Sequence, residues 1–115
     1  MDVSKQVQDK LTQFQNIQNQ IQMVSMQKQQ LMLQSADLDN AKNEIEPAAN
    51  GKIYRLVGPI LIETTKEASL KYVTDEHDSA ETKIKVLEKQ EKKLLDKMNE
   101  MRSELTSMLQ PPGGN

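Results

Sequence analysis

Apolar side chains recur every seven residues in two long stretches of the chain. The first stretch carries this repeat at Ile17, Val24, Leu31, Leu38 and Ile45, with a companion repeat at Val7, Phe14 and Ile21. The second stretch carries it at Val73, Ala80, Leu87, Leu94, Met101 and Met108, with companions at Leu70, Ile84, Met98 and Leu105. Two interleaved heptad positions form the buried seam of a coiled coil. The pattern therefore predicts a mainly α fold built on two long helices.

The predicted helices cover residues 3–46 and 65–110. Pro47 ends the first, because proline cannot continue a helix. The second opens at Thr64, which has capping-box spacing with Glu67. The proline- and glycine-rich ending, residues 111–115, is expected to be a disordered tail. Each helix has about 44 residues, or roughly 66 Å at 1.5 Å per residue. Equal lengths and a short connection favour an antiparallel two-helix coiled coil.

The two helices can be aligned by matching positions whose numbers sum to 115. In this register the facing pairs include Ile45–Leu70, Leu31–Ile84 and Phe14–Met101. A shift by one heptad is the alternative. Polar residues interrupt the seam, and Lys28 lies one layer from Glu91, so that the two side chains could form an ion pair. Isolated polar seam residues fix the register of a coiled coil at some cost in stability.

Residues 52–64, between the helices, indicate an inserted β-hairpin. Its two halves are β-branched and apolar, and Gly58-Pro59 joins them. Glycine followed by proline suits a type II′ turn, in which the glycine takes a positive φ. Closure by two residues pairs Val57 with Ile60 and, further along, Tyr54 with Glu63. One face of the hairpin then carries Ile53, Val57, Ile60 and Ile62, and the other carries Tyr54, Leu56 and Leu61.

A hairpin that is apolar on both faces needs partners. Ordering about twelve residues costs on the order of 12–24 kcal/mol of backbone entropy. Seven apolar side chains return about 1.5–3 kcal/mol each, and only when fully buried. The two open edges are also templates for further strands. We therefore expect hairpins of several chains to assemble into a β-barrel, with an interface at Ile53, Tyr54, Leu56, Val57, Gly58, Pro59, Ile60, Leu61 and Ile62. The alternative is a hairpin folded back onto its own helices.

Composition excludes most other classes of function. The net charge of −2 gives no case for nucleic acid or an anionic membrane, and the lysines of EKQEKKLLDK are interleaved with acids. With no cysteine and one histidine, His77, a metal site is not expected. No phosphate loop or Ser/His/Asp arrangement is present, so we expect no catalytic or cofactor-binding residues and no enzyme. Without a signal peptide or membrane span, the chain is expected to be cytoplasmic.

The order helix, hairpin, helix, with IYRLVGPILIETTKEA at its centre, resembles a prefoldin subunit of the β type. The resemblance covers essentially the whole chain as one domain, residues 1–115. Its most specific part is residues 54–62, supported by VQDKLTQFQNIQNQIQ near the start and QEKKLLDKMNEMRSEL near the end. A single hairpin marks the β type rather than the α type. The short chain and the SMLQPPGGN ending look more like archaeal members.

The resemblance implies a heterohexamer of two α-type and four β-type subunits. Hairpins would form a double β-barrel body, from which six coiled-coil tentacles extend. Such a complex is an ATP-independent chaperone, a holdase that binds unfolded client proteins and delivers them to a group II chaperonin. The rival interpretation is a structural coiled-coil adaptor that binds no client, which the heptads alone would support equally well.

Client binding is expected where both chain ends lie together. The expected client-binding residues of this tip are Val3, Val7, Leu11, Phe14, Met98, Met101, Leu105, Met108 and Leu109. Methionine is flexible and polarizable, which suits contact with many different apolar partners. Met23, Met26 and Met32 lie off the seam, where a solvated helix would prefer charge. The simpler interpretation is that all these side chains only widen the packed stripe.

Overall fold

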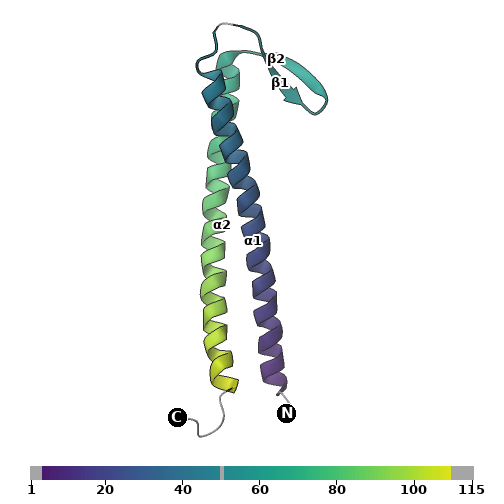
Figure 1. Ribbon diagram of the computed structural model, residues 1–115, viewed down its shortest axis with the longest axis vertical. Helices are drawn as coiled ribbons and strands as arrows, with labels where there is room; N and C mark the ends of the chain where they lie inside the picture. The colour runs from purple at the N-terminus through teal and green to yellow at the C-terminus, as the bar shows by residue number, and fades with distance from the viewer. Residues whose placement is uncertain (1–3, 50, 110–115) are drawn as a thin grey trace. The chain divides into compact units, whose positions relative to one another are not determined.

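The computed structural model describes residues 4–49 and 51–109. Helix α1 spans Lys5–Ile45, strand β1 Ile53–Val57, strand β2 Ile60–Thr64 and helix α2 Lys66–Leu109 (Figure 1). The predicted fold class, two long helices with a hairpin between them in sequence, is confirmed. The chain divides into two compact units. The first consists of Met1–Lys28 and Val86–Asn115, and the second of Gln29–Lys85.

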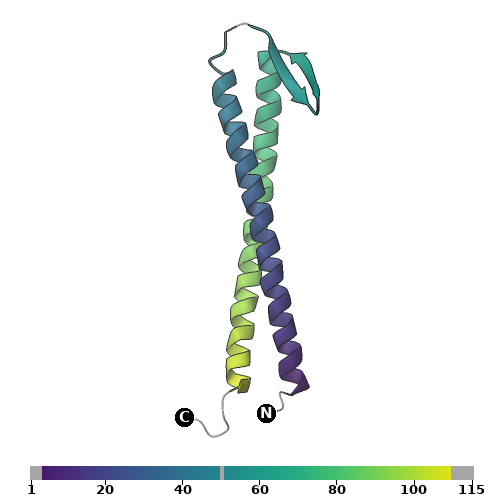
Figure 2. The ribbon, with the colours of Figure 1, turned by 45° about the vertical axis from the view of Figure 1, so that its right-hand side comes forward.

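In the first unit, the start of α1 and the end of α2 run antiparallel and side by side (Figures 1 and 2). The side chains buried there are seam residues, namely Val7, Ile17, Leu87, Met101 and Leu105. Two ion pairs cross the seam, Lys10 with Glu104 and Lys28 with Glu91. Their residue numbers sum to 114 and 119, on either side of the predicted 115. The expected pairing of Lys28 with Glu91 is confirmed.

The second unit holds the end of α1, the hairpin and the start of α2. Its buried residues are Ser35, Val73, Ala80 and Ile84. Ser35 Oγ donates a hydrogen bond of 2.6 Å to Glu81 Oε1, and His77 Nε2 lies 3.3 Å from Asp39 Oδ1. Both pairs join residues whose numbers sum to 116. These contacts confirm the predicted register rather than a shift by one heptad, which would give sums near 108 or 122.

Hydroxyl side chains cap both helices at their N-termini. Ser4 Oγ accepts a hydrogen bond of 3.2 Å from Val7 N, and Thr65 Oγ1 accepts one of 3.1 Å from Ala68 N. The predicted cap at Thr64 was wrong by one residue. Thr64 is the last residue of β2 and pairs with Ile53, so it is not available to cap a helix. The predicted helix start at residue 3 and the tail lie outside the described residues.

The hairpin has the predicted register and turn. Val57 pairs with Ile60 and Tyr54 with Glu63, in an antiparallel two-stranded sheet. Gly58 has a φ of 57°, and no other described residue has a positive φ. The two central turn residues, Gly58 and Pro59, therefore fit a type II′ turn, whereas a type I′ turn needs a positive φ at both. The turn keeps the two strands in the register that sorts their side chains onto two faces.

Candidate functional site

The hairpin presents both of its faces to solvent. Its exposed apolar side chains are Tyr54, Leu56, Val57, Ile60, Leu61 and Ile62, and Ile53 is half-buried. Gly58 and Pro59 at the turn are exposed as well. Leu56 keeps 68% of its surface in contact with solvent. The alternative of a hairpin folded back onto its own helices is therefore wrong, because such folding would cover one face.

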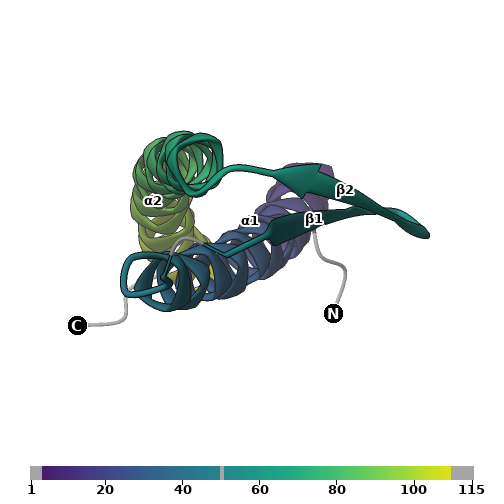
Figure 3. The same ribbon diagram turned by 90° about the horizontal axis from the view of Figure 1, so that it is seen from above.

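The hairpin contacts the helices near its root, the end of the two-stranded sheet where Ile53 pairs with Thr64. The guanidinium carbon of Arg55 lies 3.6 Å from the centre of the Tyr72 ring, a cation–π contact between β1 and α2. A hollow of about 290 Å³ lies beside it, with Ile45, Ile53 and Val73 among its walls. Seen from above the helix ends, the strands leave this root and extend away to one side (Figure 3). The root thus holds the hairpin while leaving its apolar faces uncovered.

The predicted client-binding residues are mostly covered within the first unit. Val7, Met101 and Leu105 are buried, and Phe14, Met98 and Met108 are half-buried. Leu11 and Leu109 are exposed, and Val3 lies outside the described residues. In the structure, most of the predicted tip therefore serves as seam, and contact with a client would require the helix ends to separate.

Exposed apolar side chains lie off the seam instead. Met23 and Met26 in the first unit are exposed, and so are Met32 and Leu33 in the second. Val86 and Leu95 on α2 are exposed too. The sequence interpretation named the three methionines but missed Leu33 and Val86. The signal for both was present, because an aliphatic residue outside the two heptad positions faces solvent in a two-helix coil.

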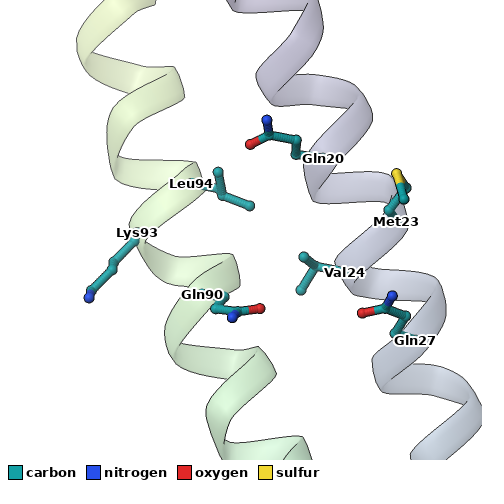
Figure 4. A pocket seen from close by; sticks show the side chains of 7 residues that line it. All are labelled: Gln20, Met23, Val24, Gln27, Gln90, Lys93 and Leu94. Carbon is teal, nitrogen blue, oxygen red and sulfur yellow. The ribbon is translucent and has the colours of Figure 1, made fainter.

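A shallow groove of about 400 Å³ lies between α1 and α2 in the first unit (Figure 4). Its walls are formed by Gln20, Met23, Val24, Gln27, Gln90, Lys93 and Leu94. Val24 and Leu94 extend toward the space between the helices, while Lys93 extends away from α1 (Figure 4). This groove was not predicted, because heptad analysis describes the seam and not the hollows along its sides.

A charged layer lies near one end of this groove. Lys28 Nζ donates a hydrogen bond of 2.9 Å to Glu91 Oε1. The hydrogen bond to Glu91 raises the pKa of Lys28 above its ordinary value, and this effect is larger than the opposing effect of desolvation. The negative charge of Glu91 is therefore neutralised by Lys28, and Glu91 is not a free carboxylate.

Among the described residues, no helix is long and apolar enough to cross a bilayer, and no group of three or more His, Asp or Glu side chains could hold a metal ion. In the second unit, the imidazole of His77 lies close to the carboxylates of Asp39, Asp78 and Glu81. His77 therefore contacts α1 through Asp39, as a residue at a seam position should.

Comparison with known proteins identifies the family. A family model described as "Prefoldin subunit" matches residues 8–111. The chain is 33% identical to prefoldin subunit beta of Thermococcus kodakarensis, over 96% of each chain. It is 32% identical to prefoldin subunit beta of Archaeoglobus fulgidus, over 98% of each chain. The crystal structure of the prefoldin beta subunit from Thermococcus strain KS-1 superposes with a TM-score of 0.87 at 33% identity, covering 96% of this chain and 98% of that one. Prefoldins are chaperone subunits and not an enzyme family, and this chain belongs to the prefoldin subunit family as a member of the β type.

Proposed function

We propose that this chain is a subunit of a hexameric, ATP-independent holdase containing two α-type and four β-type prefoldin subunits. The observation that carries the proposal is the hairpin, whose apolar side chains are exposed on both faces. An isolated two-stranded sheet is at best marginally stable in water. Pairing its edges with hairpins of other subunits would bury these side chains in a closed barrel, which has no free edges.

Unfolded proteins would be held by the helices. Leu11, Leu109 and the off-seam methionines offer exposed apolar contacts, and the seam residues of the tip become available when the helix ends fray. Each chain offers few such contacts, so a single subunit should bind weakly. Several subunits on one body raise the overall affinity through effective concentration, without any new kind of contact.

Weak, repeated contacts also suit delivery to a group II chaperonin. A competing surface can displace the subunits from a client one at a time, because no single contact contributes much of the affinity. No nucleotide is needed for such a transfer. Delivery is therefore part of the proposal, and its direct test is the transfer of a labelled client from the complex to the chaperonin.

Light scattering tests the assembly step. The full chain, alone and co-expressed with an α-type subunit, is measured beside Leu56→Gln and Leu33→Gln. These two leucines are equally exposed, at 68% and 69%, but only Leu56 lies on the hairpin. We expect Leu56→Gln to prevent the hexamer and Leu33→Gln to leave it intact. A stable monomer that ignores the α-type subunit would favour the coiled-coil adaptor instead.

Suppression of client aggregation tests the holding step. Removing residues 1–14 and 101–115 deletes the predicted tip and leaves the hairpin unchanged. We expect the truncated chain to assemble and to lose protection of a chemically unfolded client. Full protection by the truncated hexamer would contradict the assignment of client contact to the tip.

A further inference from the structure

The groove of the first unit has an apolar floor and an uncharged polar rim. Val24 and Leu94 extend into the space between the helices (Figure 4). Three exposed glutamines, Gln20, Gln27 and Gln90, surround them. A glutamine amide offers both a donor and an acceptor, so this rim can satisfy the backbone N–H and C=O groups of an extended chain. Folded proteins rarely present an unpaired backbone, whereas unfolded segments do.

The charged side chain that lines the groove is a lysine. Among the residues that line the groove, Lys93 is the charged one. Lys97 lies seven residues after Gln90 and is therefore on the same face of α2. On α1, no aspartate or glutamate occurs from residue 10 to residue 28. Glu91 is paired with Lys28. Glu100, seven residues after Lys93, follows on the same face but is not among the residues that line the groove. A ligand in the groove thus meets the ammonium group of Lys93 before any carboxylate.

The opposite side of the first unit differs in shape. The α2 face that carries Leu95 also carries Glu88, Lys92 and Arg102. Both sides have exposed apolar side chains and a surplus of positive charge. The groove side adds a hollow lined by glutamine amides and by Lys93.

From these observations we propose that the groove binds extended segments of unfolded polypeptide in which apolar side chains stand next to aspartate or glutamate. An apolar side chain enters between Val24 and Leu94 and contacts the exposed Met23. The glutamine amides bind the segment's backbone, and the ammonium groups of Lys93 and Lys97 attract its carboxylates. This inference rests on the proposed holdase function and adds a chemical preference to it, at a place distinct from the tip, which stays necessary for protecting a whole client.

Fluorescence anisotropy with two labelled peptides of about ten residues tests this preference. One peptide has leucines flanked by glutamates, and the other has lysines in place of the glutamates. With the full-length chain, we expect the glutamate peptide to bind roughly tenfold tighter at low salt, and the difference to shrink in high salt as charges are screened. Equal binding of the two peptides would overturn the proposal.

Two pairs of matched variants locate the binding site. Met23 and Met26 are equally exposed, at 62% and 63%, but only Met23 lines the groove. Met23→Gln should weaken glutamate-peptide binding several-fold and Met26→Gln should not. Lys93→Glu and Lys92→Glu make the same charge change on neighbouring residues, and only Lys93→Glu should remove the peptide preference. Equal effects within either pair would place the binding elsewhere and overturn the proposal.

Two further measurements test the groove assignment separately from the proposed holdase function on which it rests. If Met23→Gln changes the mass of the assembly in light scattering, the groove is a contact between subunits and the proposal fails. If the chain suppresses client aggregation normally but shows no peptide preference, the holdase function stands and the groove assignment falls. If peptide preference is present while aggregation is not suppressed, the groove assignment stands and the holdase function falls.

Discussion

Lys28 and Glu91 form a hydrogen-bonded ion pair across the seam of the first unit, with 2.9 Å between Nζ and Oε1. Both side chains are about one-fifth exposed, so the pair lies at the edge of the packed layers rather than in open solvent. It ties one point on α1 to one point on α2. A slip of the helices by one heptad would separate these charges, and the pair therefore favours a single register.

The stabilisation by this pair should disappear at high pH. The hydrogen bond raises the pKa of Lys28 in the folded state above its ordinary value of 10.5. A raised folded-state pKa means that the contribution is complete below the unfolded-state value and is lost as the pH rises through the folded-state value. Thermal melts of the wild type and Lys28→Gln should therefore differ at neutral pH and converge above about pH 10.5. Lys89→Gln, at an exposed position, is the control and should match the wild type throughout. A difference that persists at high pH would show that the amide disturbs packing instead.

Seam and off-seam methionines should respond differently to truncation. Met101 is only 4% exposed, and Met23 is 62% exposed. Met101→Ala should destabilise the folded chain by about 2–5 kcal/mol, the range for removing a buried methionine side chain. Met23→Ala should change it by no more than about 0.5 kcal/mol. Urea unfolding followed by circular dichroism at fixed chain concentration measures both. Similar losses for the two variants would mean that Met23 is covered in solution.

The cation–π contact between Arg55 and Tyr72 should couple the hairpin to α2. Contacts of this kind at exposed sites contribute about 0.5–1 kcal/mol. A double-mutant cycle with Arg55→Ala and Tyr72→Leu should give a coupling energy of that size in chemical unfolding. Additive effects of the two substitutions would show that the contact does not hold the hairpin root. Lys52→Ala is a suitable control, because its ion pair with Glu63 is long, at 4.0 Å, and exposed.

The helix cap distinguishes two neighbouring threonines. Thr65→Ala removes the hydroxyl that accepts the hydrogen bond from Ala68 N and should cost about 1 kcal/mol. Thr65→Ser, which keeps the hydroxyl, should restore most of it. Thr64→Ala leaves the cap in place, so its effect should be smaller. A larger loss for Thr64→Ala would restore the cap predicted from the sequence. Thermal melts under one set of conditions compare all three variants.

The parts of the fold that follow a strict repeat could be predicted from sequence. Heptad positions identified the seam residues and the pairing of Lys28 with Glu91, and Gly58-Pro59 fixed the hairpin register. The cap was misplaced because Thr64 and Thr65 are both threonines, and capping-box spacing to Glu67 favoured the wrong one. Only the strand ladder, which occupies Thr64, decides between them.

The surface that we propose for client contact was harder to predict. Met101 and Leu105 carry the same side-chain chemistry whether they fill a seam or bind a partner, and burial separates the two roles. The groove beside Val24 depends on how wide the gap between neighbouring side chains is. That width follows from glutamine rotamers and helix separation, neither of which the repeat encodes. The exposure of Leu33 and Val86 could have been predicted from the sequence, because neither residue occupies a heptad position of the seam.

The uncovered hairpin also has a meaning for a chain that has not found its partners. A newly synthesised copy carries two apolar faces and two free strand edges, the features that protein quality control recognises in damaged proteins. We expect orphan copies to be degraded or to aggregate when they are made in excess of the partner subunits that we propose. The surface that we assign to assembly would then also set how much of the subunit a cell can accumulate.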